Sequence, residues 1–111
     1  MGQFWTVINN ITVLIADALR KADYYAALRR LPLPKPATWL EEGIRANNTV
    51  LIDTIQRFKG LESPIVILWG LDTIDLTRSE ELLYVGMSRA KSLLIVFGTA
   101  ATCAAFEGAT A

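Results

Sequence analysis

The sequence of 111 residues contains no histidine and a single cysteine, Cys103. A lone cysteine cannot form an internal disulfide, which favours a reducing, cytoplasmic setting, and without histidine no metal site is expected. No uninterrupted apolar run reaches the roughly 18–20 residues of a membrane span, so no membrane partner is expected. Basic and acidic residues number 11 each, so the chain lacks the broad positive field of many nucleic-acid-binding proteins.

A phosphate-binding loop is also missing, because no G-x-x-x-x-G-K-[ST] pattern occurs in the chain. ATP-dependent chemistry would therefore need a second domain that supplies the loop and a metal-holding acid. Apolar residues, in contrast, are abundant and make up 52% of the chain. So high a content in so short a chain predicts an exposed apolar face and self-association of the isolated domain.

Apolar runs and helical patterns alternate along the chain. Continuous apolar runs, which predict buried strands, occupy residues 11–15, 49–54, 65–69 and 93–97. Helical spacing or a capping box predicts helices at 19–30, 38–45 and 78–91. The two capping boxes are TWLE, which begins at Thr38, and TRSE, which begins at Thr77. This alternation is typical of an α/β domain whose open, mainly parallel sheet is flanked by helices.

The first polar segment of interest is TIQRFKGLE, from Thr54 to Glu62, which directly follows a predicted strand. Ligands of open parallel sheets bind at the carboxyl ends of the strands, so we expect the segment at that edge. Gly60 lets the backbone approach a ligand, Glu62 can accept from sugar hydroxyls, and Gln56 and Lys59 can donate to phosphate oxygens. The same residues also fit a structural role in which Gly60 ends a helical turn and Glu62 is solvated.

The second segment, EELLYVGMSRAK, covers residues 80–91 and places Arg89 in the last turn of a predicted helix. At helical spacing Arg89 lies on the same side as Glu81 and Val85. Alone, Arg89 fits an ordinary cation at a helix C-terminus, where it interacts favourably with the helix dipole.

Together, and in this order, TIQRFKGLESPIVIL and EELLYVGMSRAK resemble motifs V and VI of the UvrD/Rep-like superfamily 1 helicases. The resemblance covers residues 49–98, with motif V at about 54–62 and motif VI at about 80–91. It implies a RecA-like, P-loop NTPase-like fold, with residues 1–111 forming one truncated second helicase domain. It also favours a tight parallel crossover with a single helical turn between Thr54 and Pro64, where spacing alone also allows a hairpin.

The resemblance implies a role for each motif residue. Arg89 is the expected catalytic arginine finger, which reaches the γ-phosphate of ATP, while Gly60 and Glu62 form the wall beside the ribose. The backbone of single-stranded DNA is expected to contact Thr54, Gln56 and Lys59. ATP and Mg²⁺ would be held mainly by the first RecA-like domain of the same full-length chain, so this chain alone is expected to be inactive.

Two departures from the family pattern stand beside these matches: Gln56 replaces a common histidine, and Ser63-Pro64 replaces a common aromatic or acidic pair. One alternative is therefore a degenerate helicase-like module that docks nucleic acid or protein without hydrolysing ATP. Another is an unrelated doubly wound domain, such as a receiver-type fold. The intact Arg89 and Glu62 argue against the first alternative, and Asp17, the single acid after the first strand, argues against the second.

Overall fold

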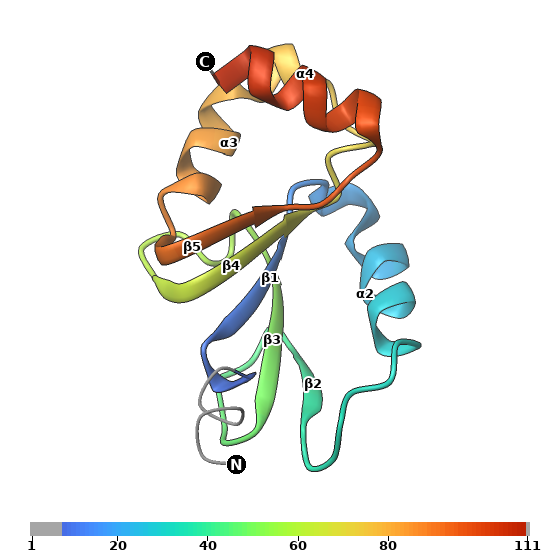
Figure 1. The fold of residues 1–111 in the computed structure, drawn as a ribbon, viewed down its shortest axis with the longest axis vertical. Coiled ribbons are helices and arrows are strands. Elements are labelled where there is room, and N and C mark those ends of the chain that lie inside the picture. The colour runs from blue at the N-terminus through green and yellow to red at the C-terminus, as the bar shows by residue number, and fades with distance from the viewer. Residues whose placement is uncertain (1–7, 111) are drawn as a thin grey trace.

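The computed structural model describes residues 8–110 and confirms the expected α/β fold. The strands of this part of the chain form one sheet in the order β2-β3-β1-β4-β5, and every neighbouring pair is parallel (Figure 1). The central strand β1 therefore pairs with β3 on one side and β4 on the other. The strands are β1 Ile11–Ile15, β2 Thr38–Glu41, β3 Thr49–Thr54, β4 Ser63–Trp69 and β5 Ala90–Val96.

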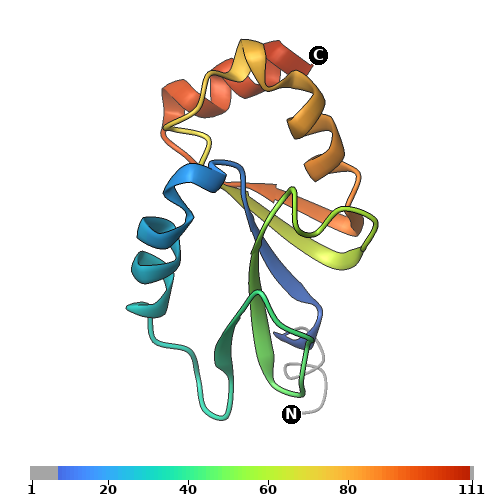
Figure 2. The same cartoon turned by 180° about the vertical axis from the view of Figure 1, so that it is seen from behind.

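Helices lie on both faces of the sheet (Figures 1 and 2). Each strand packs against both layers, because its side chains point alternately to the two faces. On one face Val13 packs with Tyr25 of α2, and on the other face Leu14 belongs to the same cluster as Leu83 of α3. The last helix, α4, packs against α3 and the short helix η2. The helical elements are η1 Ala18–Arg20, α2 Lys21–Arg29, η2 Leu76–Arg78, α3 Glu80–Met87 and α4 Ala100–Thr110.

The helix predicted at 38–45 is wrong, because Thr38–Glu41 forms the edge strand β2. A capping box requires Glu41 to reach back to the N–H of Thr38, but that N–H donates to the carbonyl of Asn48 at 2.9 Å. Thr38 instead pairs with Thr49 across the sheet. Pairing with β3 therefore overrides a local pattern that fits a helix start equally well.

The helix predicted at 78–91 is shorter than expected and runs only from Glu80 to Met87. Thr77 does not cap it, because the backbone N–H and hydroxyl of Thr77 both bond to Asp75 at the start of η2. At the other end, Ala90 already pairs with Ser63 in the sheet. Arg89 consequently lies in the turn after the helix, and not in its last turn.

The connection from β3 to β4, residues 55–62, crosses β1 and joins two parallel strands. We call this segment the crossover. The N–H of Phe58 donates to the carbonyl of Thr54 at 3.1 Å, which makes one turn of helical type. Ile55 and Phe58 are buried in the same cluster as Leu14. The tight parallel crossover is thus confirmed, and the hairpin is excluded.

Helix α2 leaves β5 uncovered on its side of the sheet. Leu93, Ile95 and Phe97 are 49%, 40% and 61% exposed, and they alternate along this edge strand. An apolar cavity of about 230 Å³ lies beside them, with Trp39 and Trp69 in its wall. The expected apolar face is therefore present, while self-association remains a prediction.

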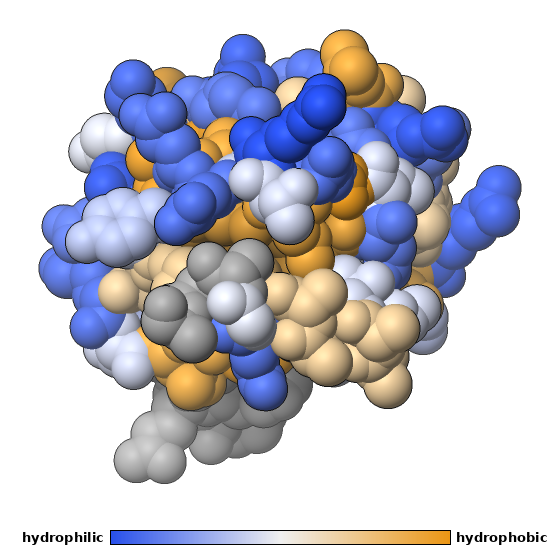
Figure 3. All heavy atoms as spheres, turned by 90° about the horizontal axis from the view of Figure 1, so that it is seen from above, coloured by the Kyte–Doolittle hydropathy of each residue, from blue (hydrophilic) through white to orange (hydrophobic). Residues whose placement is uncertain are grey.

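The end of the molecule that carries α3 and α4 presents both kinds of side chain. Hydrophilic residues gather towards the top and left of this view, and apolar residues are visible in its centre and lower part (Figure 3). None of the helices within residues 8–110 combines the length and the apolar character that spanning a bilayer requires.

Candidate functional site

The crossover and helix α3 run side by side on one face of the sheet. Both lead from the carboxyl ends of the strands back to the amino ends, because each joins two parallel strands. Their close approach depends on Gly86, since a Cβ at this position would lie 2.8 Å from Cδ1 of Ile55. Ile55 is fully buried, so it has little freedom to move aside.

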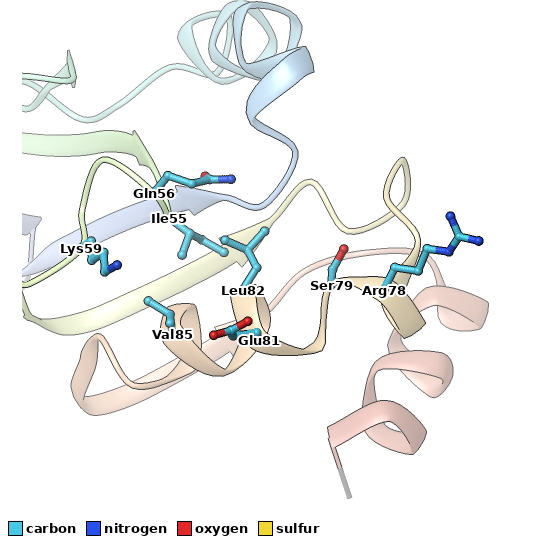
Figure 4. A pocket seen from close by; sticks show the side chains of 8 residues that line it. All are labelled: Ile55, Gln56, Lys59, Arg78, Ser79, Glu81, Leu82 and Val85. Atoms are coloured by element: carbon cyan, nitrogen blue, oxygen red, sulfur yellow. The ribbon is translucent and has the colours of Figure 1, made fainter.

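A groove of about 520 Å³ lies between the crossover and α3. Gln56 and Lys59 extend from the crossover on one side, and Glu81 and Val85 lie on α3 on the other (Figure 4). Arg78 stands at one end of the groove, with its guanidinium directed away from the other labelled side chains (Figure 4). The complete lining is Ile55, Gln56, Lys59, Arg78, Ser79, Glu81, Leu82 and Val85.

Arg89 joins the two motifs at the amino ends of the strands. Its Nη1 donates to the carbonyl of Leu61 in the crossover at 3.2 Å, and its Nε donates to the carbonyl of Val85 in α3 at 3.2 Å. Its Nη2 contacts the hydroxyl of Ser88 at 3.0 Å. The backbone N–H of Ser63 donates to the carbonyl of Arg89 at 2.9 Å. Side chain and backbone of Arg89 are thus both bonded to the segment that contains Glu62.

The expected position of Glu62 at the carboxyl edge is wrong. Thr54 ends β3 at that edge, but Ser63 begins the parallel strand β4, so the crossover must return to the amino edge. Gly60 and Glu62 therefore lie near the amino ends of the strands, together with Arg89. Gln56 remains near the carboxyl ends. Gln56, predicted to contact DNA, and Glu62, predicted to contact the nucleotide, therefore lie at opposite ends of the crossover.

The predicted site residues differ in accessibility. Gln56, Lys59 and Glu62 are exposed, and among the described residues their side chains have no hydrogen-bond or ionic partner. Gly60 adopts a φ of +85°, which favours glycine, and open space surrounds the position of a Cβ. Thr54 is only 2% exposed, and its hydroxyl accepts the N–H of Arg57 at 3.3 Å. Its side chain is therefore used within the chain.

Arg57, the other cation of the crossover, belongs to an ion-pair network at the carboxyl edge. Its Nε lies 3.1 Å from Asp53 Oδ1 and 3.4 Å from Glu42 Oε1, and Lys21 Nζ lies 2.7 Å from Glu42 Oε2. The hydrogen bond from Lys21 holds the pKa of Glu42 below its usual value, whereas burial raises the pKa of Asp53. The network therefore accounts for Arg57 without any ligand.

Sequence reasoning missed Arg45, which binds the amino ends of two strands together. Its Nη1 donates to the carbonyls of Asn9 and Thr49, at 2.5 and 3.1 Å. Its Nη2 donates to the carbonyl of Ile11 and the hydroxyl of Thr12, at 2.6 and 2.5 Å. Burial lowers the pKa of the Arg45 guanidinium, although an arginine remains protonated in proteins. No sequence signal marks this residue, because its partners are backbone groups that only the fold brings together.

Arg45 and Glu62 also line a common cavity of about 480 Å³ at the amino edge. The cavity is bounded by Phe58 and Leu61 of the crossover and by Asn9 before β1. It lies beside the joint between Arg89 and the crossover, because Leu61 belongs to both. The predicted ribose-facing carboxylate and a previously unassigned cation therefore share one hollow.

Comparison with known proteins gives one match. A search of curated proteins found no match. Residues 49–97, however, match the family model of the UvrD-like helicase C-terminal domain. The matched span runs from β3 through the crossover and α3 to the end of β5, so it contains both motifs and the contact between them. Over these residues the chain is thus similar to the UvrD-like helicase C-terminal domain, as the sequence motifs predict.

Proposed function

We propose that this chain supplies the C-terminal half of the ATPase and translocation site of an ATP-dependent DNA helicase. The matched family is part of ATP-dependent helicases, which supports the reaction class. The observation that carries the proposal is the hydrogen bond from Arg89 Nη1 to the carbonyl of Leu61. It couples the arginine of motif VI to the KGLE segment of motif V, as a shared nucleotide site requires.

The nucleotide end of this half-site consists of Gly60, Glu62 and Arg89. The exposed carboxylate of Glu62 can accept hydrogen bonds from ribose hydroxyls, and the open space at Gly60 allows close approach of a ligand. Of the five N–H donors of Arg89, three are engaged within the chain, which leaves two for a phosphate. These donors would stabilise negative charge that builds up on the phosphoryl oxygens.

ATP supplies the phosphoryl group whose transfer drives translocation. In this proposal the chain contributes only part of the ATP site. The described residues contain no group of three or more acids that could hold a metal ion. We therefore assign Mg²⁺ and the triphosphate mainly to the first RecA-like domain, in line with the division of labour in such enzymes.

The nucleic-acid end of the half-site is the groove between the crossover and α3. Gln56 and Lys59 line it as exposed donors that have no partner within residues 8–110, a combination suited to the phosphates of single-stranded DNA. Arg78 adds a cation at one end, where its side chain is 88% exposed and forms only a 3.6 Å pair with Asp75. We assign Thr54 an indirect role, because its buried hydroxyl holds the turn from which Gln56 extends.

The test is Arg89→Ala in the full-length helicase, including the domain with the Walker A loop. ATP turnover should fall on the order of 10³-fold, because an arginine finger acts on the transition state, while nucleotide affinity changes little. Arg89→Lys should restore little activity, since an ammonium lacks the planar fork of donors. The matched control is Arg30→Ala, which removes an exposed cation at the end of α2 on the opposite face.

Steady-state phosphate release and a nucleotide-binding titration give the two readings. Turnover of Arg89→Ala within a few-fold of the parent would leave Arg89 as an ordinary helix-end cation. A parent enzyme that binds DNA but never hydrolyses ATP would favour the degenerate binding module instead.

A further inference from the structure

Buried hydroxyl groups of Thr12 and Ser63 are hydrogen-bonded in series near the amino ends of the strands. We call this series, which begins at Arg45 and ends at the carbonyl of Asn10, the hydroxyl chain. It has no part in the half-site proposed above. Thr12 of β1 is 0% exposed and Ser63 of β4 is 3% exposed. The hydroxyl of Thr12 lies 3.0 Å from the hydroxyl of Ser63. These residues lie 51 positions apart in the sequence, and the Thr12 hydroxyl also contacts Arg45.

Arg45 fixes the direction of the hydrogen bonds in the hydroxyl chain, because a guanidinium can only donate. Arg45 Nη2 donates to the Thr12 hydroxyl, so that hydroxyl is free to donate to the Ser63 hydroxyl. The Ser63 hydroxyl in turn donates to the carbonyl of Asn10 at 2.8 Å. A charged donor at one end polarises the bonds that follow it, so the chain is stiffer than two isolated hydroxyl contacts.

Ser63 links this chain to the proposed nucleotide end. Its backbone N–H donates to the carbonyl of Arg89, while the carbonyl of Leu61 accepts from the Arg89 guanidinium. Glu62 therefore lies between two residues that are both bonded to Arg89. A shift of Ser63 would strain the bonds that hold Arg89 beside the segment that contains Glu62.

We propose that Ser63 is a positioning residue that sets the distance between Glu62 and Arg89, and that Thr12 and Arg45 hold it in place. This inference rests on the proposed function for its catalytic consequence. It also explains the departure at Ser63-Pro64. A small hydroxyl fits the buried site, and Pro64 restricts Ser63 to an extended backbone that aims its N–H at Arg89.

The test compares variants that remove a buried hydroxyl inside and outside the chain of hydroxyls. Ser63→Ala and Thr12→Val remove a member, whereas Thr12→Ser keeps the hydroxyl and serves as the conservative rescue. The matched control is Thr49→Val, because within residues 8–110 the Thr49 hydroxyl bonds only to the carbonyl of Ala46, at 2.6 Å, and Thr49 is 7% exposed. Ser63→Ala, Thr12→Val and Thr49→Val each remove one buried hydroxyl, whereas Thr12→Ser keeps it.

The first readout is the NMR signal of the Arg89 Nε–H in the 111-residue protein, assigned by its disappearance in Arg89→Lys. We expect the signal to shift or broaden in Ser63→Ala and Thr12→Val, to return in Thr12→Ser, and to stay in place in Thr49→Val. An unchanged signal in both hydroxyl-deleting variants overturns the proposal, and so does an equal shift in Thr49→Val. Should Ser63→Ala not fold, the Thr12→Val and Thr12→Ser pair decides alone.

The second readout is ATP turnover by the full-length helicase. Ser63→Ala should lower kcat on the order of 10- to 100-fold with little change in KM, because misplacement of a catalytic group acts on the transition state. Thr49→Val should keep the parental kcat. If the proposed function is wrong, Arg89→Ala leaves turnover intact while the NMR result still stands. A shifted Arg89 signal with parental kcat in Ser63→Ala overturns the catalytic part of the inference.

Discussion

Charged side chains have different partners at the amino edge of the sheet, where the strands begin, and at the carboxyl edge, where they end. At the carboxyl edge, cations and acids neutralise each other, with Arg57 beside Asp53 and Lys21 beside Glu42. At the amino edge, the Arg45 and Arg89 side chains are bonded to backbone carbonyls and hydroxyls, with no ion pair to an acid among the described residues. A cation bonded to neutral groups leaves a net positive charge in its surroundings, whereas a cation and an acid in an ion pair have no net charge together.

This difference reverses the usual expectation for open parallel sheets, whose ligands bind at the carboxyl ends of the strands. At the carboxyl edge, Lys21, Glu42, Asp53 and Arg57 form ion pairs with one another. The amino edge retains positive charge and the free carboxylate of Glu62. An anionic ligand with hydroxyl groups would therefore find its complement at the amino edge. The predictions below test whether the two edges differ as described.

The largest effect is expected from Arg45→Met at the amino edge. The substitution leaves three carbonyls and one hydroxyl without their charged donor, in a half-buried place. We expect a loss of roughly 3 kcal/mol in the free energy of unfolding. Arg57→Met at the carboxyl edge should cost only about 0.5–1 kcal/mol, because its side chain is 51% exposed. Urea unfolding of both variants gives the comparison. Equal losses, or a greater loss for Arg57→Met, would remove the distinction between the edges.

A smaller effect should follow from Gly86→Ala, which acts between the edges where α3 touches the crossover. The added methyl group meets the buried Ile55 at 2.8 Å, so we expect a loss of about 1–3 kcal/mol from overpacking. Gly108→Ala in α4 is the control, since nothing lies within 4 Å of its Cβ and alanine favours a helix. Thermal unfolding should place the two variants on opposite sides of the parent. A stable Gly86→Ala variant would mean that the contact between the two motifs is looser than described.

The smallest effect concerns pH and the carboxyl edge. The pKa of Glu42 is lowered in the folded state, chiefly by the hydrogen bond from Lys21. The contribution of Glu42 is therefore present above its unfolded-state pKa and is lost as the pH falls through the folded-state value. Asp53 opposes it, because burial raises its pKa. The free energy of unfolding should decline from about pH 5 towards pH 3, and Glu42→Gln should flatten this decline by about 1 kcal/mol or less.

Urea titrations at each pH measure this slope. Lys21→Met removes the main partner of Glu42 and should flatten the decline in the same direction. If neither substitution alters the slope, the ion pairs of the carboxyl edge do not contribute to stability as inferred.

Local sequence was sufficient wherever a short pattern decides the structure. The apolar runs predicted β1 and β3 within their observed bounds, and the two motifs predicted the family. Thr38–Glu41 was misread because its capping pattern is local, whereas its partner strand β3 becomes available only in the fold. The edge assigned to Glu62 was wrong for a related reason. It follows from the direction of β4, and not from the residues that precede Glu62.

The positions of the two arginines show where sequence reasoning ends. Arg57 lies within the polar segment TIQRFKGLE, but it forms ion pairs with Asp53 and Glu42, and Glu42 precedes it by fifteen positions. Arg45 looked like the end of a helix, yet it holds together the amino ends of β1 and β3. Both outcomes depend on contacts between distant segments. A pattern of residue types along a few turns cannot encode such contacts.

The central position of β1 also constrains the order in which the native sheet can form. Among the five strands of the sheet β1 is synthesised first, and the residues that pair with it follow about 40 and 54 positions later. All its pairings are therefore distant in sequence, a topology that is typical of slow folding. The crossover has no surface on which to pack Ile55 and Phe58 until β1 lies beneath it. The bond between Thr12 and Ser63 can close only when β4 has joined the other side of β1. It thus marks the completion of the centre of the sheet.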